Sequence, residues 1–430
     1  METETIKRAI SDQEAETASK FKAERIISRE CDAEIQKYTK KANAVVISGP
    51  RRSGKSTAAI LLVKDKTYAR LNFDDPSLEG MKAEDLVKVT EAIYDLKGDV
   101  EYVILDEIQN IKGWELYVSR LRETKKVIVT GSNSNLMSEE LASRLTGRYV
   151  SFTTFPFSFR EFLDYSGFKF NTHLTKDVAR MKKLFDEYLR GGGFPEALAF
   201  GSRFLAQIYN DIITKDIERR FNIRYRGTFR ELSRYLVSNI SKEVSYNKLK
   251  NIFNIKSIHT IRDYVGFLEN AYLLFKIDKY SPKLKQQVWT NKKVYCIDTG
   301  IVNAMGFRAE EEKGRLLENM VAVELLRRKY YWNVNSSVFY WQDYAHNEVD
   351  FVVRENDAVT QLIQVSYRVD DYDTKSREMK SLISASKELK CGKLLVLTYD
   401  YDGVKKFEGK TIKFIPAWRW LLEIGMGVTD

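Results

Sequence analysis

The sequence predicts an α/β protein with a parallel sheet near its N-terminus, and three observations support this fold class. Three short, mostly apolar runs, at residues 44–47, 103–105 and 126–130, have the length and β-branching of buried strands. Each run ends in polar residues, and helix-compatible segments lie between the runs. Strands that alternate with helices form parallel sheets, and polar residues then gather at the carboxyl edge, where such sheets bind ligands.

The composition is that of a folded chain with several domains. The 430 residues are 43% hydrophobic and 12% aromatic, with only six prolines, so we expect two to four domains. Residues 1–40 are charged and helix-compatible. We expect the first twenty of them to be loosely ordered, and residues 24–38 to form a helix over the start of the core.

The charge and the cysteines indicate the partners and the compartment. The net charge is +10 and the pI is near 9.1, which favours polyanions and nucleic acid in particular. The three cysteines, Cys31, Cys296 and Cys391, are far apart and odd in number, so we expect no disulfide or zinc framework. The chain starts without an apolar signal core, and no run approaches the ~20 apolar residues that span a bilayer. We therefore expect a cytoplasmic protein that does not bind membranes.

Residues 49–56, GPRRSGKS, fit the pattern G-x-x-x-x-G-K-[ST] at every fixed position. A strand-like run before them and a helix-compatible run after them give the context that distinguishes a phosphate loop from a chance match in a turn. Backbone N–H groups and a helix N-terminus then attract phosphate. Lys55 is expected to reach the β- and γ-phosphates of ATP, and Ser56 to bind Mg²⁺. The predicted nucleotide-binding residues are Gly49, Pro50, Arg51, Arg52, Ser53, Gly54, Lys55, Ser56 and Thr57.

Two adjacent acids follow the next apolar run, in EYVILDEIQ at residues 101–109. This is a Walker-B pattern, in which Asp106 is expected to hold Mg²⁺ and Glu107 to orient and activate the attacking water. Adjacent strand residues point to opposite sides, so the two carboxylates can take different roles. Asp74 and Asp75 end an earlier short strand, where a solvated turn and a ligand site are both open interpretations.

Further groups are expected to act on the γ-phosphate. Ser132 or Asn133, after the run at 126–130, is predicted to sense the phosphate and the water, although a polar turn fits equally well. Arg144 and Arg148 are candidates for an arginine that stabilises the transition state, supplied by the same subunit or by a neighbour in a homo-oligomer. Both arginines fit plain surface positions as well.

The ordered series of motifs resembles a family of AAA+ ATPases of archaea and bacteria that carry a C-terminal domain of unknown function. The motifs are GPRRSGKST, ILDEIQ followed by Gly113-Trp114, VTGSNS, LTGR, FPFSFREFL and GGGFPEAL, and the resemblance runs from about residue 40 to about residue 400. It implies that the helical, aromatic-rich segment from residue 155 to about 220 is a lid over the nucleotide. Arg190 is then either a lid arginine near the γ-phosphate or a charge before a glycine helix cap.

The next segment is strongly basic. Residues 221–287 contain thirteen Lys or Arg against five Asp or Glu. A helix from about residue 244, a turn at 254–256, a helix at 257–270 and a strand at 271–280 form a winged helix-turn-helix pattern, which predicts DNA binding by the second helix. A protein–protein module remains an open alternative. The predicted DNA-contacting residues are Ser257, His259, Thr260, Arg262, Lys283, Lys285, Lys292 and Lys293.

The last segment resembles a PD-(D/E)xK nuclease core. A helix with Glu318, a strand with Glu348 and Asp350, and a further strand at 362–366 follow that pattern, in which two carboxylates hold a divalent metal and a lysine polarises water. The position of the second strand acid holds Gln364 and that of the lysine holds Ser366. We therefore expect the nuclease-like fold without efficient cleavage; Arg368 could replace the lysine only in part.

The sequence thus predicts five segments and three possible functions. The segments are an N-terminal helical extension at 1–40, a P-loop ATPase core at 41–154, a helical lid at 155–220, a winged helix-turn-helix at 221–293 and a nuclease-like domain at 294–430. The favoured function is an ATPase that couples its nucleotide state to DNA handling. The alternatives are a nucleotide-gated, metal-dependent DNA nuclease and an ATP-binding adaptor for a protein partner.

Overall fold

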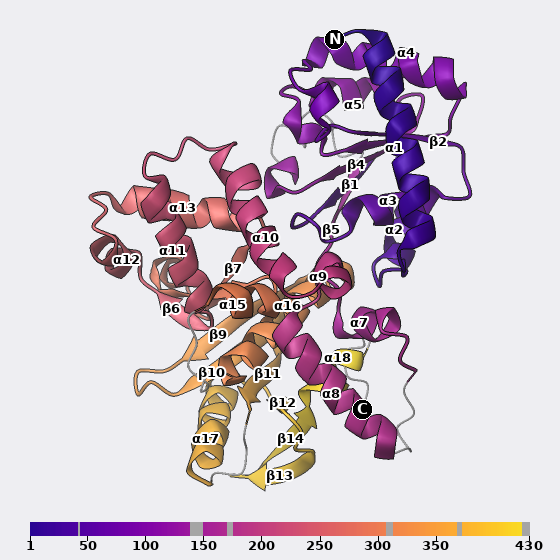
Figure 1. Cartoon of the computed structure of the whole chain (residues 1–430). Coiled ribbons are helices and arrows are strands. Elements are labelled where there is room, and N and C mark those ends of the chain that lie inside the picture. Colours follow the sequence, from indigo (N-terminus) through magenta and orange to yellow (C-terminus); the bar gives the residue numbers. More distant parts are fainter. Residues whose placement is uncertain (42–43, 138–148, 170–174, 307–312, 368–371, 424–430) are drawn as a thin grey trace. The chain divides into compact units, whose positions relative to one another are not determined.

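The computed structural model describes the chain except for residues 42–43, 138–148, 170–174, 307–312, 368–371 and 424–430 (Figure 1). The chain forms two compact units. The N-terminal unit consists of residues 1–155, 164–167 and 270–272, and the C-terminal unit consists of residues 156–163, 168–269 and 273–430. Each unit contains its own sheet.

A parallel sheet organises the N-terminal unit. In the described part of this unit, five strands pair in the order β2-β3-β4-β1-β5. Their bounds are β1 Ala44–Ser48, β2 Tyr68–Asn72, β3 Tyr102–Asp106, β4 Lys126–Gly131 and β5 Tyr149–Thr153. Every residue of β1 and β3 is buried, as expected for parallel strands covered on both faces. The predicted α/β class with a parallel sheet is confirmed.

Helices cover both faces of this sheet. The helices are α1 Thr3–Ala23, α2 Asp32–Thr39, α3 Lys55–Val63, α4 Leu86–Lys97 and α5 Glu115–Leu121, with short 3-10 turns η1 Pro76–Leu78, η2 Ala83–Asp85, η3 Ile108–Asn110 and η4 Ser134–Met137. One hydrophobic core is formed by side chains of α1, α4 and α5 and of the strands β1, β2, β3 and β4. Helices α2 and α3 pack against β1, and α3 also contacts β3 and β4.

The N-terminal extension differs from its prediction. Residues expected to be loosely ordered form α1, and the helix expected at residues 24–38 is confined to α2. The reason is the spacing of the buried residues Ile6, Ala9, Ile10 and Gln13, which lie on one face of α1 and pack against α4 and β2. Gln13 also bonds the edge of the sheet, because its Oε1 accepts the Asn72 backbone N–H at 2.7 Å.

A long mixed sheet runs through the C-terminal unit. Among its described residues, nine strands follow the order β13-β14-β12-β11-β10-β9-β7-β8-β6. Their bounds are β6 Lys242–Val244, β7 Leu274–Lys279, β8 Lys292–Cys296, β9 Ser336–Gln342, β10 Glu348–Glu355, β11 Ala358–Ser366, β12 Leu394–Thr398, β13 Gly403–Phe407 and β14 Lys410–Pro416. The predicted boundary between residues 293 and 294 falls inside β8, which pairs with both β6 and β7. Two residues of β7 also pair with β9, so the sheet continues across that boundary.

Helices flank this second sheet and fill the segment before it. After β5 the helices are α7 Phe159–Tyr165, α8 Thr175–Gly191, α9 Pro195–Phe200, α10 Arg203–Asp211, the π-helix η5 Ile212–Glu218, α11 Arg226–Ser238, α12 Tyr246–Ile252, α13 Ile258–Asn270, α14 Leu284–Trp289, α15 Thr299–Met305, α16 Lys313–Tyr331, α17 Tyr372–Glu388 and α18 Ala417–Leu422. Helix α16 packs against β8, β9 and β11, and α17 packs against β10 and β11. Within the described residues, no helix combines the length and the apolar character needed to cross a bilayer.

Candidate functional site

The strand order of the N-terminal unit brings the predicted site residues to one edge. Strand β4 lies between β1 and β3, with Ser48 opposite Gly131 and Asp106 opposite Thr130. The phosphate loop follows β1, the acidic pair lies at the end of β3, and Ser132 follows β4. Because all three strands are parallel, these groups meet at their carboxyl ends.

The phosphate loop depends on two glycines. Gly49 has φ +144°, and a Cβ there would lie 2.2 Å from the Thr154 backbone oxygen, so a larger residue would collide with the chain. Gly54 has φ +92° and precedes the first residue of α3. A left-handed residue at this point lets the loop turn directly into the helix. The N–H groups of the loop and of the first turn of α3 therefore lie next to each other.

The remaining loop residues have defined positions. Lys55 is only 4% exposed, and its Nζ donates to the Pro50 backbone oxygen at 2.9 Å. Ser53 is buried, with its hydroxyl 3.1 Å from that of Thr154. Arg51 forms an ion pair with Asp74 at 3.0 Å. Arg52 has a left-handed backbone with φ +65°, and Thr57 lies half-buried in the first turn of α3.

Asp106 lies beside the hydroxyl predicted to share its metal. The Ser56 Oγ donates to Asp106 Oδ1 at 2.9 Å, and the Thr130 hydroxyl donates to the same oxygen. Arg70 forms an ion pair with Oδ2 at 2.6 Å. Burial alone would raise the pKa of Asp106, but Arg70 and the two hydroxyls outweigh it and lower the pKa. Asp106 is therefore held as a carboxylate, and together with the Ser56 hydroxyl it gives the hard oxygen donors that Mg²⁺ takes.

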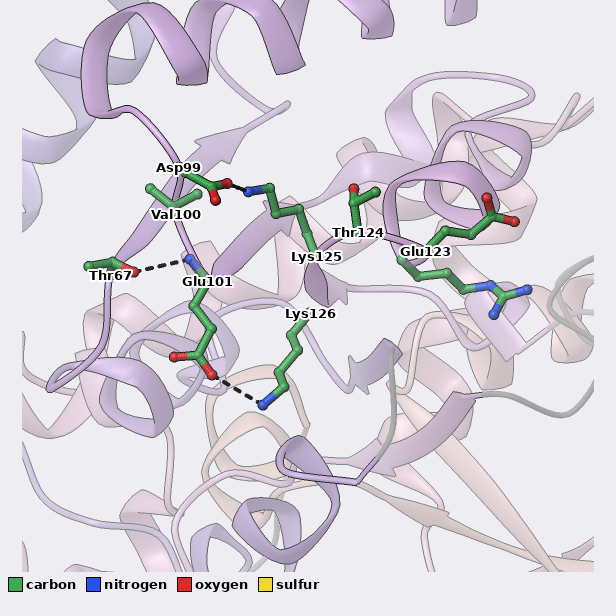
Figure 2. Close-up of a pocket in the computed structure, with 9 residues that line it drawn as sticks. Thr67, Asp99, Val100, Glu101, Glu123, Thr124, Lys125 and Lys126 are labelled. Atoms are coloured by element: carbon green, nitrogen blue, oxygen red, sulfur yellow. Dashed lines mark hydrogen bonds and ion pairs between the residues drawn. The ribbon is translucent and has the colours of Figure 1, made fainter.

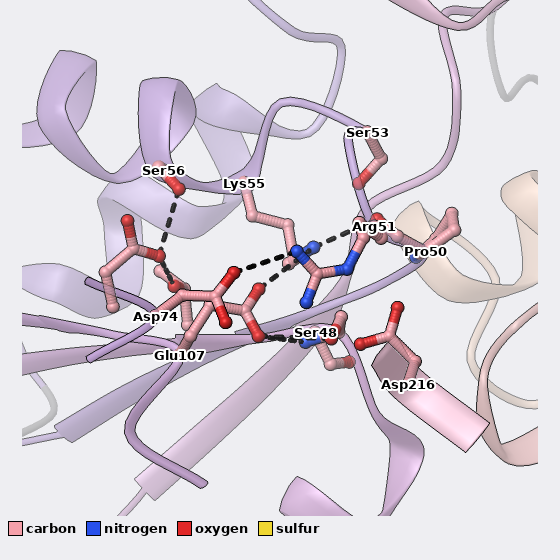
Figure 3. Close-up of polar contacts among 12 residues, drawn as sticks. Ser48, Pro50, Arg51, Ser53, Lys55, Ser56, Asp74, Glu107 and Asp216 are labelled. Carbon is pink, nitrogen blue, oxygen red and sulfur yellow. Dashed lines mark hydrogen bonds and ion pairs between the residues drawn. The ribbon is translucent and has the colours of Figure 1, made fainter. Parts of the chain in front are cut away.

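Glu107 directly follows the last residue of β3, and Figure 3 shows its side chain beside Lys55. Its backbone is left-handed, with φ +54°, a conformation that costs about 1–3 kcal/mol in a non-glycine residue and is often found at functional sites. The Ser132 N–H and Oγ donate to Glu107 Oε2 at 3.2 and 3.1 Å, and the Gln109 amide also donates to this oxygen. Glu107 Oε1 lies 3.8 Å from Lys55 Nζ. The carboxylate therefore faces the phosphate loop.

Some of the other predicted groups contact the residues at this edge, and others lie outside the described residues. Ser132 contacts Glu107, and Asn133 is buried directly after it. Arg144 and Arg148 lie outside the described residues. Of the two acids left open by the sequence, Asp74 contacts Arg51 of the loop, whereas Asp75 caps the short η1 turn by accepting the Ser77 N–H at 2.9 Å.

Sequence reasoning missed two arginines that support the site. Arg70 reaches Asp106 from β2, and Arg29 donates to the Ser53 oxygen at 2.8 Å and to the Phe155 oxygen at 2.6 Å. Arg29 is 6% exposed and precedes α2, so the N-terminal extension fastens the loop. A charged residue within the short strand at 68–72 was the available signal for Arg70, because buried arginines are rare without a partner. For Arg29 the sequence gives no comparable signal.

A polar hollow at the opposite edge of the sheet is distinct from this site (Figure 2). It has a volume of about 410 Å³ and is lined mainly by residues that precede β3 and β4. Four of its charged residues pair with one another: Lys125 contacts Asp99, and Lys126 contacts Glu101 at 3.1 Å.

Arg190 lies in the last turn of α8, directly before a tightly packed glycine turn of the C-terminal unit. Its backbone oxygen accepts the Asn303 amide at 2.7 Å. A Cβ on Gly192 would lie 2.0 Å from the Asp298 carboxylate, and one on Gly193 would lie 2.2 Å from the Phe157 oxygen. The Gly193 N–H donates to Asp298 at 2.7 Å. This close packing explains Gly192 and Gly193, whereas a Cβ on Gly191 would meet nothing within 4 Å.

Seven of the eight predicted DNA-contacting residues are exposed or half-buried, and the eighth, Lys293, is buried. Ser257, His259, Thr260 and Arg262 lie at the start of α13; His259 and Arg262 are exposed, whereas Ser257 and Thr260 are half-buried. Lys283 and Lys285 lie at α14, and Lys292 begins β8. Lys293 does not fit the prediction: it is 3% exposed and forms three ion pairs inside the unit. Successive strand residues point to opposite faces of a sheet, and the Lys293 side chain lies on the face that meets Glu318 of α16, so it does not face an external phosphate.

The ion pairs of Lys293 are with the acids of the nuclease-like pattern. Its Nζ lies 3.1 Å from Glu318, 2.6 Å from Glu348 and 3.3 Å from Asp350. Burial and the neighbouring Asp350 raise the pKa of Glu318, while Lys293 acts in the opposite direction. The cluster is closed by further bonds: Tyr295 donates to Glu318 at 2.8 Å, and the Val365 N–H donates to Asp350 at 2.9 Å.

Gln364, at the position of the missing acid, also belongs to this cluster. Its Oε1 accepts the Asp350 backbone N–H at 3.2 Å. In the part of the chain that the structure describes, no group of three or more His, Cys, Asp or Glu side chains is arranged to hold a metal ion. The cation found among these acids is the ammonium of Lys293.

Comparisons with known proteins agree with the site in the N-terminal unit. A model described as "AAA domain" matches residues 41–163. Two models described as domains of unknown function, DUF8612 and DUF4143, match residues 182–312 and 313–420. Together with the parallel sheet, the phosphate loop and the acidic pair, the first match supports an ATPase domain of the AAA type at residues 41–163.

Two relatives extend the similarity over nearly the whole chain. An uncharacterized protein of Methanocaldococcus jannaschii is 31% identical over 423 residues, which cover 93% of this chain and 92% of the relative. An uncharacterized protein of Haemophilus influenzae is 30% identical over 396 residues, which cover 87% and 93%. The chain belongs to the same family as these two proteins. Among solved structures, the Walker-type ATPase of Pyrococcus abyssi is similar at 12% identity, with a TM-score of 0.43 and coverage of 65% of this chain and 96% of that chain.

Proposed function

We propose that this protein hydrolyses ATP with Mg²⁺ and uses the nucleotide state to control how it holds DNA. The observation that carries the first half is the meeting of four groups at one sheet edge. Lys55 lies 3.8 Å from Glu107, and Ser56 lies 2.9 Å from Asp106. These are the loop lysine, the metal-binding hydroxyl, the metal-binding acid and the water-activating acid that phosphoryl transfer in a P-loop ATPase requires.

Each of these residues has a distinct role in the proposed reaction. The loop N–H groups and Lys55 bind the β- and γ-phosphates and stabilise the charge that develops on them. Ser56 and Asp106 would hold Mg²⁺, which supplies further charge neutralisation when it is bound. Glu107 orients the attacking water and accepts its proton. Ser132 fixes the Glu107 carboxylate through two hydrogen bonds, so its proposed part is to position the base.

The second half of the proposal rests on charge and exposure in the C-terminal unit. Residues 221–287 hold most of the excess positive charge of the chain. Helices α12 and α13, separated by a turn with left-handed Asn254, lie next to the antiparallel strands β7 and β8. We interpret this arrangement as a winged helix-turn-helix. Exposed cations on such a surface bind the phosphate backbone without reading sequence.

Steady-state hydrolysis with and without DNA tests the proposal. ATP turnover is expected to rise with DNA and to disappear in Lys55→Ala. Tight ATP binding without any turnover would favour the adaptor alternative. Turnover that no form of DNA changes would overturn the coupling to DNA while leaving the ATPase intact.

The nuclease alternative receives no support from the geometry of the C-terminal cluster. Its three acids, Glu318, Glu348 and Asp350, each form an ion pair with Lys293, and Gln364 and Ser366 replace the remaining acid and lysine of that chemistry. We therefore propose that this domain serves binding and structure. Incubation of the protein with Mn²⁺ and linear or forked DNA checks this, because cleavage that is lost in Asp350→Ala would reverse the assignment.

A further inference from the structure

A cavity lies beside α13 in the C-terminal unit. It has a volume of about 550 Å³ and is enclosed by β6, α12, α13, α14 and the start of β8. This volume is within the range of pockets that hold small ligands. The sequence pattern placed DNA contacts on neighbouring residues but indicated no cavity.

The lining of the cavity combines an apolar floor with aromatic edges. Val244, Ile258, Val265 and Val294 provide aliphatic surface from three elements, β6, α13 and β8. Tyr246 and Trp289 are the aromatic members of the lining. The Trp289 indole is 81% exposed, so its ring is accessible to a ligand. A flat apolar ligand could pack against this surface.

Three cations lie in the same lining and favour an anionic ligand. The Arg262 guanidinium lies 5.8 Å from the centre of the Tyr246 ring, and Lys276 donates to the Tyr246 hydroxyl at 3.1 Å. Lys276 is paired with Glu269 at 2.7 Å, and Lys292 is paired with Asp278. Arg262, in contrast, forms no ion pair with any residue that the structure describes. It is exposed on α13 and therefore has its charge available to a ligand.

We propose that this cavity receives an unpaired nucleotide of single-stranded or tailed DNA. The base would stack on Trp289 above the aliphatic floor, and Arg262 would contact the adjoining phosphate. Aromatic surfaces accept the π-face of every base, and cations beside them follow the backbone, which is how proteins bind single strands without sequence preference. The inference rests on the proposed DNA binding and specifies which form of DNA is preferred.

Fluorescence anisotropy with three DNA forms tests the inference. The forms are a blunt duplex, the same duplex with a thymidine tail, and the tail alone. The wild-type protein is expected to bind the two forms with unpaired thymidines more tightly than the blunt duplex. Trp289→Ala should weaken these two by about tenfold and leave the blunt duplex unchanged. Trp289→Phe should keep part of the preference, because phenylalanine still offers a stacking face.

Two control variants separate stacking from charge and from general loss of an aromatic side chain. Lys285 lies on α14 beside Trp289 but does not line the cavity, so Lys285→Ala should weaken all three DNA forms equally. Tyr344 is fully exposed in another part of the unit, so Tyr344→Ala should leave the preference unchanged. Quenching of intrinsic fluorescence by the thymidine tail should be reduced in Trp289→Phe, which keeps the other five of the six tryptophans.

The outcomes distinguish this inference from the function on which it rests. Equal affinity of the wild-type protein for the blunt and tailed duplexes overturns the inference alone. So does a preference for tailed DNA that survives in Trp289→Ala, provided that circular dichroism shows the variant to be folded. Failure of all three forms to bind would overturn both the inference and the proposed DNA binding.

Discussion

The two units each contain a cluster of buried acids with a lysine, but the two lysines are used differently. In the N-terminal unit, Lys55 bonds a backbone oxygen and stays 3.8 Å from Glu107. In the C-terminal unit, Lys293 lies within 3.3 Å of three carboxylates. The first lysine belongs to a loop with N–H groups that attract an anion, whereas the second neutralises its neighbours.

The two sites differ in the groups that balance the charge of their acids. At the first site Asp106 is paired with Arg70, and Glu107 is fixed by hydrogen bonds from Ser132 and Gln109. At the second site a side chain of the protein provides the balancing charge. A buried ion cluster of this kind is costly to break and gives little net stability relative to an apolar core.

The largest effect is expected at Glu107. Glu107→Gln keeps the size of the side chain and removes the base, so ATP hydrolysis should fall by about 10²–10⁴-fold. ATP binding should be retained, because the phosphate contacts of Lys55 and of the loop remain. Turnover by phosphate release and binding by a fluorescent ATP analogue measure the two effects. Wild-type turnover in this variant would show that Glu107 is not the base of the first site.

Lys293→Met tests the second cluster. The substitution leaves three acids without their cation and should destabilise the C-terminal unit by about 3–5 kcal/mol in urea unfolding. The adjacent Lys292 provides the control, since its partner Asp278 is partly exposed, and Lys292→Met should cost less than about 1 kcal/mol. Adding Glu318→Gln to Lys293→Met should recover part of the loss. Equal stability of the two single variants would contradict the neutralising role.

Asp298 is a further buried acid, and backbone N–H groups donate hydrogen bonds to it. Burial raises its pKa to about 6, against the N–H donors of Gly193 and Ile301. A raised folded-state pKa favours the protonated form, so the stability from this group is present below about pH 4 and is lost as the pH rises through about 6. Two pKa units correspond to about 3 kcal/mol.

The measurement is urea unfolding of the wild type and of Asp298→Asn across this pH window. The free energy of unfolding of the wild type relative to the variant should fall by up to about 3 kcal/mol between about pH 4 and about pH 7. A constant difference would show that the carboxyl group is charged in the folded protein throughout the window.

The smallest expected effect is at Arg29, which fastens the phosphate loop from outside the sheet. Arg29→Ala removes the bonds to the Ser53 and Phe155 oxygens and should weaken ATP binding by about tenfold. Arg25 is a matched control, because it is exposed and donates only to the Asp164 backbone oxygen at 3.0 Å among the bonds described for it. Arg25→Ala should bind ATP as the wild type does. Equal ATP affinity in the two variants would make Arg29 a purely structural residue.

The sequence predicted the parts of the molecule that depend on local pattern. The phosphate loop, the strand before it and the acids at the end of β3 lie within short stretches, and parallel order brings them together. Strand alternation and the glycine spacing were therefore enough to predict which edge of the sheet carries the phosphate loop and the acids. The same local logic located α12 and α13 to within a few residues.

Pairs that form across long distances in the chain were not predictable. Lys293 carries no mark that distinguishes it from Lys292, and its burial follows only from the pairing of β8 with both β6 and β7. Arg29 contacts an oxygen 126 residues away. Helix α1 was not predicted because its few buried apolar residues lie among many charged ones. In each case the tertiary partner, absent from the local sequence, decides the role of the residue.

A crystal structure of the protein with Mg²⁺ and a non-hydrolysable ATP analogue is the most direct test of the proposed nucleotide site. We expect the γ-phosphate beside Lys55 and the metal at about 2.1 Å from the Ser56 hydroxyl, with Asp106 in its coordination sphere. Glu107 should face the γ-phosphate from across the metal. A nucleotide bound elsewhere, or Asp106 and Glu107 turned away from it, would contradict the account.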